Sequence, residues 1–182
     1  MRVLAIPASN SPNGINRQLI GFATRLLQEG LVGDAEVEML DLNEYEMPIY
    51  SVLRQEELGI PEEAQRFYDK IGSADAVVVS FAEHNGSYSV AWKNLYDWTS
   101  RLDIQVYQGK KVAMFATSPG SRGGAGVLRL ATETAGYYGA DLVGSLGIGR
   151  FWENFDPELG EISDADLRSE FEDVLRALGA SG

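Results

Sequence analysis

Two patterns of apolar and polar positions alternate along the chain. Compact apolar runs predict strands at residues 3–8, 36–42, 76–82, 111–117 and 141–149. Between and after these runs, apolar residues recur at helical spacing, as Ile15, Leu19 and Phe22 do after the first run. This alternation favours βαβ units and a parallel sheet.

The character of each run predicts its place in the sheet. Residues 3–8 are continuously apolar, as expected of a strand buried on both faces, and Pro7 predicts the strand's end because proline has no N–H group. Residues 36–42 alternate in polarity and glycines interrupt 141–149, so both predict edge strands. We therefore expect a single domain over residues 1–182 with the α/β flavodoxin-like fold. This fold is a doubly wound five-stranded parallel sheet in the order 2-1-3-4-5, with helices on both faces.

Three other segments carry more local signals. Residues 45–59 predict a long irregular connection with exposed apolar side chains, and 163–166 resemble a capping box at the start of a last helix. In the helix expected over 91–102, Trp92 and Tyr96 lie off the main apolar stripe. This offset predicts a second apolar face on that helix for a partner subunit.

Three polar loops follow the first, third and fourth predicted strands, which are neighbours in the expected order. Residues 9–16, 83–87 and 118–124 should therefore converge on one ligand. In the first loop, hydroxyl and amide side chains precede a helix that begins near Ile15, whose free N–H groups and dipole favour a phosphate. An ordinary helix cap is the alternative for this loop taken alone. It is not a Walker A loop, because no Gly-Lys-Ser/Thr follows.

The second and third loops suit a flat heteroaromatic ring. Residues 83–87 combine an acid, an imidazole, an amide and a glycine. Taken alone, Glu83 is more usually a solvated loop acid, and His84 a hydrogen-bonded loop residue rather than a general base. In 118–124, Gly123 and Gly124 allow close ligand approach and Arg122 is the only charge. The candidate cofactor-binding residues are Ser9, Ser11, Gly14, Ile15, Asn16, Glu83, His84, Asn85, Gly86, Ser87, Ser118, Pro119, Gly120, Ser121, Arg122, Gly123 and Gly124.

Composition removes several classes of function. The chain of 182 residues has no cysteine and only one histidine, which excludes thiolate nucleophiles, disulfides and a histidine-rich metal site. A net charge of −12 argues against a nucleic-acid surface. No apolar run approaches the roughly 20 residues that span a bilayer, and the first residues are too short for a signal peptide. We expect a cytoplasmic enzyme without a metal.

The three loops also resemble the motifs of a known family, the NADPH-dependent FMN reductases, which include flavin, quinone, chromate and azo-dye reductases. The family's Gly-Ser-Leu-Arg-x-x-Ser-x-Asn is similar to residues 8–16, in which Ser9 and Asn16 agree. Four positions of this loop depart from the motif: Ala8, Asn10, Ser11 and Gly14.

The other motifs agree more closely. The family's Pro-Glu-Tyr-Asn-Gly-Ser is similar to residues 82–87, with Ala82 in place of proline and His84 in place of tyrosine. Residues 93–98 match Lys-Asn-x-x-Asp-Trp, and 118–124 resemble the third family loop. The resemblance covers roughly residues 1–150.

The resemblance implies an FMN-dependent NAD(P)H oxidoreductase. Hydride would pass from NADPH or NADH to FMN and on to flavin, quinone or another small acceptor, without a catalytic side chain. It also implies a homodimer or homotetramer, with 46–57 and the aromatic helix at the interface. Two alternatives remain: a flavodoxin-like electron carrier, and a binding module of the same fold that has lost flavin.

Overall fold

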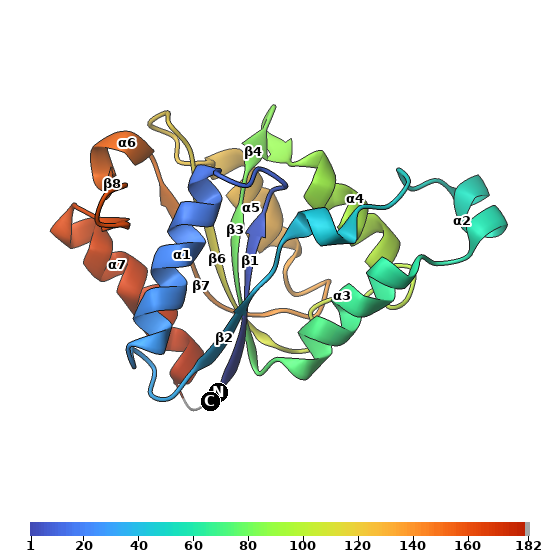
Figure 1. Cartoon of the computed structure of the whole chain (residues 1–182), viewed down its shortest axis with the longest axis horizontal. Helices are drawn as coiled ribbons and strands as arrows, with labels where there is room; N and C mark the ends of the chain where they lie inside the picture. The colour runs from blue at the N-terminus through green and yellow to red at the C-terminus, as the bar shows by residue number, and fades with distance from the viewer. Residues whose placement is uncertain (181–182) are drawn as a thin grey trace.

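Five parallel strands form the central sheet of the computed structural model, which describes residues 1–180 (Figure 1). Their order is β2-β1-β3-β6-β7, which confirms the predicted 2-1-3-4-5 order. The strands are β1 (Arg2–Ala8), β2 (Glu36–Met39), β3 (Ala76–Phe81), β6 (Lys111–Thr117) and β7 (Asp141–Ile148). As predicted, β2 and β7 are the edge strands and β1, β3 and β6 are buried.

Helices cover both faces of the sheet (Figure 1). One face carries α1 (Ile15–Gln28) and α7 (Ala165–Arg176), and the other carries α3 (Glu62–Ser73), α4 (Val90–Thr99) and α5 (Ala125–Thr134). Shorter elements complete the described chain: η1 (Leu42–Tyr45), α2 (Val52–Leu58), β4 (Glu83–His84), β5 (Ser87–Tyr88), α6 (Phe151–Asn154), β8 (Phe155–Asp156), β9 (Glu161–Ile162) and η2 (Ala177–Gly179). None of the helices in this part of the chain is long and apolar enough to cross a membrane.

The first strand ends at Ala8, one residue beyond Pro7 and close to the predicted end. The strand continues through Pro7, which is paired in register with Ser80 of β3. The N–H of Leu40 donates to the carbonyl of Ala5, so odd-numbered residues of β1 direct their backbone groups toward β2. The β2 ladder ends at the pairing of Ala5 with Met39, before it reaches Pro7. Since the backbone nitrogen of Pro7 faces the β2 side beyond the end of that ladder, its missing N–H group removes no hydrogen bond between strands.

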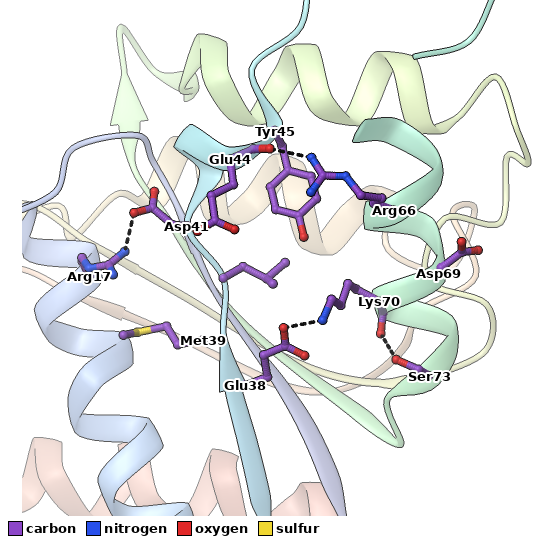
Figure 2. Close-up of a pocket in the computed structure, with 11 residues that line it drawn as sticks. Arg17, Glu38, Met39, Asp41, Glu44, Tyr45, Arg66, Asp69, Lys70 and Ser73 are labelled. Carbon is purple, nitrogen blue, oxygen red and sulfur yellow. Dashed lines mark hydrogen bonds and ion pairs between the residues drawn. The ribbon is translucent and has the colours of Figure 1, made fainter. Parts of the chain in front are cut away.

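A groove of about 690 Å³ runs beside the edge strand β2, between it and α3 (Figure 2). Two of its three cationic side chains are paired with acids: Lys70 Nζ lies 2.6 Å from Glu38, and Arg17 lies 3.8 Å from Asp41. The third, Arg66, donates to the backbone carbonyl of Glu44 at 2.8 Å. A hydrogen bond from the backbone N–H of Asn43 holds the pKa of Asp41 below its ordinary value. Acidic side chains outnumber cationic ones in the lining, four to three, so this groove does not offer a site for an anion.

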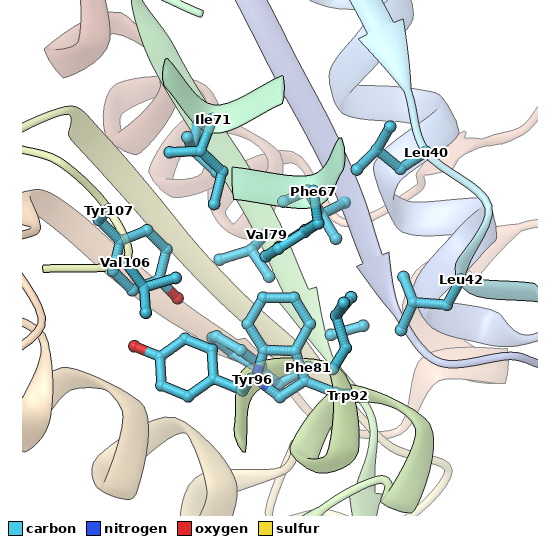
Figure 3. Packing of buried hydrophobic residues seen from close by; sticks show 14 of the residues in the cluster. Leu40, Leu42, Phe67, Ile71, Val79, Phe81, Trp92, Tyr96, Val106 and Tyr107 are labelled. Carbon is cyan, nitrogen blue, oxygen red and sulfur yellow. The ribbon is translucent and has the colours of Figure 1, made fainter. Parts of the chain in front are cut away.

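The aromatic residues of α4 are part of the core rather than an outer face (Figure 3). Trp92 is 1% exposed and Tyr96 is 8% exposed. The ring of Trp92 lies 5.9 Å from Phe67 of α3 and 5.6 Å from Phe81 of β3. The predicted second apolar face for a partner subunit is therefore wrong, because α3 and the chain's own loops cover it.

Because three tyrosines are buried in this core, the free energy of unfolding should decrease at alkaline pH. Burial raises the pKa of Tyr88 from 10.0 to about 12, and it also raises the pKa of Tyr96 and Tyr107. These phenols keep their protons when folded, whereas the unfolded chain releases them above about pH 10. Their contribution to stability is therefore complete below pH 10 and is lost as the pH rises toward 12 and beyond.

We expect Tyr107→Phe to flatten this dependence. One buried phenol contributes a slope of about 1.4 kcal/mol per pH unit to the free energy of unfolding. Urea unfolding at several pH values above 10 measures that slope. Tyr137→Phe is the matched control, because this side chain is 68% exposed. Equal slopes in both variants would contradict the burial argument.

The connection after β2 is partly ordered, which corrects the prediction of a wholly irregular segment 45–59. It contains α2, none of whose residues is buried, and Figure 1 shows this helix extending away from the sheet. The preceding stretch 46–50 is fixed to α4: Asn94 donates to the carbonyls of Met47 and Pro48, and the indole of Trp98 donates to Pro48. A helix without a buried face leaves no periodic apolar signal, so the sequence does not reveal it.

The last helix begins one residue later than the capping pattern predicts. Asp164, and not Ser163, is the N-cap of α7, and its carboxylate accepts from the N–H of Leu167 at 2.8 Å. The helix itself is confirmed, with Phe171 and Leu175 buried. Asp and Ser are both favourable caps, so the pattern alone could not choose between adjacent positions.

Candidate functional site

The three polar loops converge on one cavity at the carboxyl ends of β1, β3 and β6. Its volume is about 200 Å³. The residues that line it are Ser9, Ser11, Gly14, Ile15, Asn16, Ala82, Glu83, His84, Thr117, Ser118 and Pro119. Two of these, Ala82 and Thr117, are absent from the predicted candidates because each lies at the end of an apolar strand. The candidates 85–87 and 120–124 lie outside the lining.

Helix α1 directs an uncapped N-terminus at this cavity. Its N-cap is Gly14, which has no side chain to accept from the first turn. By contrast, Ser89 caps α4 by accepting from Trp92 N–H. The carbonyl of Gly14 takes the N–H groups of residues 17 and 18, and the earlier N–H groups of Ile15 and Asn16 stand at the helix end that lines the cavity. Free N–H groups and the helix dipole together favour an anion here.

The side chain of Asn16 is held in one orientation by the sheet. It is buried, and the Ser80 hydroxyl donates to its Oδ1 at 2.7 Å. Because the amide oxygen is engaged with β3, the amide NH₂ on the opposite side remains as a donor toward the cavity that Asn16 lines. Ser9 adds a hydroxyl, whose oxygen accepts from Ser11 N–H at 3.2 Å. The first loop thus presents donors rather than acceptors.

The carboxylate of Glu83 is engaged with helix α5. Its Oε2 accepts from Val127 N–H at 2.9 Å in the first turn of α5, where a carboxylate also complements the helix dipole. A Cβ atom on Gly126 would lie 2.8 Å from this oxygen, so the glycine gives the carboxylate its space. Although Glu83 lines the cavity, its charge is satisfied by α5.

Residues 83–88 form a short hairpin, which explains Asn85 and Gly86. Both have positive φ, 52° and 78°, as a two-residue type I′ turn requires. These residues form the turn and lie outside the cavity, and Ser87 pairs with His84 across the hairpin. Sequence reasoning grouped all five as ring contacts, but the structure brings only Glu83 and His84 to the cavity.

The glycine pair of the third loop approaches the chain's own backbone. Gly123 and Gly124 are buried, with φ of 57° and 73°. A Cβ on Gly123 would lie 2.7 Å from Gly149 N, and one on Gly124 would lie 2.8 Å from the Cβ of Ala116. Both glycines therefore pack closely on β6 and the end of β7, and close approach of a ligand to their backbone stays a prediction. Ser118 and Pro119 bring this loop to the cavity instead.

A second cavity adjoins the first through His84. It has a volume of about 280 Å³ and lies between 42–49 and the start of α4. The exposed imidazole of His84 lines both cavities. Among residues 1–180, no group of three or more His, Asp or Glu side chains is arranged to hold a metal ion.

The chain is similar to known proteins over most of its length. The family model described as NADPH-dependent FMN reductase matches residues 1–153. A quinone reductase of Escherichia coli is 29% identical over 162 residues, which cover 87% of this chain and 85% of that protein. An NAD(P)H-dependent FMN reductase of Pseudomonas aeruginosa is 30% identical over 126 residues, covering 68% of this chain and 63% of that protein. Among solved structures, the flavoenzyme NAD(P)H:(acceptor) oxidoreductase FerB of Paracoccus denitrificans has a TM-score of 0.74 at 26% identity, covering 98% of this chain and 94% of that one.

Proposed function

The chain belongs to the NADPH-dependent FMN reductase family, and from this we infer that the three-loop cavity holds FMN and that the electrons pass on to a quinone-type acceptor. The protein is an FMN-dependent NAD(P)H oxidoreductase. Bound FMN supplies the hydride chemistry, so no strongly acidic or basic side chain is needed for that step. We infer a quinone-type acceptor because relatives such as the Escherichia coli protein are named quinone reductase.

The observation that carries the proposal is the donor set at α1. Two helix N–H groups, the NH₂ of Asn16 and the hydroxyl of Ser9 face the cavity from one loop. These groups fit a terminal phosphate, because helix N-termini and neutral donors bind phosphate without lysine. They also compensate for the arginine of the family motif, which is Ser11 here. We assign the phosphate to this loop, and the flavin ring to Glu83, His84, Ser118 and Pro119.

The lining of the cavity also bears on the alternative of an electron carrier. Such carriers sandwich the flavin ring between aromatic side chains, and none of the lining residues is Phe, Tyr or Trp. An enzyme instead needs one ring face open to NAD(P)H and then to the acceptor. The lining therefore favours the reductase over the carrier.

An FMN titration followed by stopped-flow mixing tests this function. We expect the protein to retain FMN after desalting and NADPH or NADH to bleach the flavin absorbance rapidly. Benzoquinone should then restore the absorbance. Flavin that binds but is not reduced would support the carrier, and protein that retains no FMN would support the module that has lost flavin.

We also propose a cytoplasmic homodimer or homotetramer, since the reaction consumes NAD(P)H that the cytoplasm supplies. The candidate interface is the segment 46–57, which includes most of α2. Four large apolar side chains are exposed on or next to this helix: Ile49, Val52, Leu53 and Leu58. Apolar side chains grouped on a projecting helix are typical of a surface that a partner covers.

We expect Leu53→Asp to dissociate this oligomer. Leu53 is 69% exposed in the single chain, and a carboxylate buried between subunits would lose its hydration. Sedimentation velocity over a range of concentrations measures the shift to monomer. Leu159→Asp is the control, since Leu159 is 61% exposed but follows β8 on the other side of the sheet (Figure 1). If only Leu159→Asp dissociates the oligomer, the interface lies on the side of β8 and not at α2.

A further inference from the structure

The only histidine in the chain lies between the two cavities at the carboxyl ends of the strands. His84 is exposed and lines both the three-loop cavity and the adjoining one of about 280 Å³. Its position is set by the β4–β5 hairpin, where the related motif carries tyrosine. A histidine exchanges protons in the neutral pH range, which a tyrosine does not.

Side chains alternate between the two faces of the β4–β5 hairpin, and this alternation directs His84 away from α5. Adjacent side chains on a strand point to opposite faces, and cross-strand partners share a face. Glu83 and its partner Tyr88 face α5, because Glu83 accepts from Val127 N–H. His84 and its partner Ser87 must then occupy the opposite face, toward the adjoining cavity that His84 lines.

The adjoining cavity has a mixed lining, which suits a flat ring with apolar faces and polar oxygen atoms at its edge. Met47, Ile49, Val90 and Ala91 contribute apolar surface to it. Its outer wall is the stretch 46–50, which the hydrogen bonds from Asn94 and Trp98 hold against α4. Polar groups come from Asn10, Asn43, Ser89 and Asn94, so the lining offers a small molecule both apolar surface and hydrogen-bonding groups.

We propose that the adjoining cavity binds the quinone-type acceptor and that His84 is a catalytic acid that protonates it. This rests on the proposed function. Reducing a quinone to a hydroquinone takes two electrons and two protons, and a hydride, which bound FMN would supply, accounts for both electrons and one proton. The second carbonyl oxygen takes the other proton from the imidazolium form of His84: one N–H bond breaks, an O–H bond forms, and the neutral imidazole that is left regains a proton from water.

No other group at this cavity is as well suited. Tyr45 lines it, but burial raises the pKa of its phenol, which makes it a weaker acid near neutrality. Glu46 is the remaining acidic residue of the lining, and the Glu46→Gln variant described below tests whether it takes part. Glu83, on the opposite face of the hairpin, is engaged with α5. The facing residues of α4 and of the first loop carry no charge.

His84→Gln tests the proton transfer, with ferricyanide as the internal reference. Ferricyanide accepts one electron and no proton, so its rate reports flavin content and reduction. We expect the ratio of the 1,4-benzoquinone rate to the ferricyanide rate to fall about 100-fold in His84→Gln. In the wild type, the benzoquinone rate should decline as the pH rises. This decline should disappear in His84→Gln. Glu46→Gln is the matched control and should keep that pH dependence. An unchanged ratio in His84→Gln overturns the proposal.

Nuclear magnetic resonance gives a readout that does not depend on turnover. Because the chain has a single histidine, untagged protein shows one imidazole Cε1–H signal without assignment. Adding hydroquinone to the oxidised, FMN-loaded protein should shift that signal, and an unshifted signal overturns the assignment. Failure of NADPH to reduce the wild-type flavin would instead contradict the proposed function, so the two failures are distinguishable.

Discussion

Replacing Gly123 by alanine is expected to destabilise the fold by about 2–5 kcal/mol. The φ of 57° costs a residue with a side chain about 1–2 kcal/mol. In addition, the new Cβ would lie 2.7 Å from Gly149 N and 2.8 Å from the carbonyl carbon of Ile148. Both neighbours are backbone atoms of a paired region and cannot rotate away, so the overlap adds about 1–3 kcal/mol.

The measurement is the free energy of urea unfolding without cofactor, so that FMN binding does not mask the loss. Gly120→Ala is the control in the same loop, because a Cβ there meets nothing within 4 Å. Gly123→Ala should also weaken FMN, since Ser118 and Pro119 of this loop line the cavity. If both alanine variants unfold at the same urea concentration, the loop does not pack on β7 as described.

The placement of the loops could be predicted because it follows from topology. Continuous apolar runs identified β1, β3 and β6 as central strands, and right-handed crossovers left one compact order. Loops after adjacent parallel strands must meet at one edge of the sheet. The cavity between 9–16, 83–84 and 117–119 is the consequence.

What individual side chains do there could not be predicted, because it depends on contacts across the chain. Glu83 is engaged by α5, whose first turn lies about forty residues later, and Asn16 is oriented by Ser80 of β3. Similarly, the periodicity of α4 suggested one buried stripe, whereas neighbours cover Trp92 and Tyr96 from other directions. Sequence spacing records the local period of a helix but not how many elements surround it.

Replacing Asn16 by aspartate is expected to weaken FMN binding about 100-fold. Aspartate has nearly the same shape, and its carboxylate can still accept from the Ser80 hydroxyl, so the local fold should persist. It cannot donate, and it places a negative charge beside the proposed phosphate. Loss of a hydrogen bond to a charged group costs about 1.5–3 kcal/mol, and each 1.4 kcal/mol is about tenfold in affinity.

Fluorescence titration measures this affinity, and riboflavin locates the effect. Riboflavin lacks the phosphate, so Asn16→Asp should change its affinity far less than that of FMN. Asn154→Asp alters the net charge by the same amount, but the Asn154 amide donates to Gly149 and lies outside the cavity lining. It should therefore leave FMN affinity close to that of the wild type. Equal losses for FMN and riboflavin in Asn16→Asp would mean that Asn16 contacts the ring or ribityl chain, and that the phosphate lies elsewhere than at the N-terminus of α1.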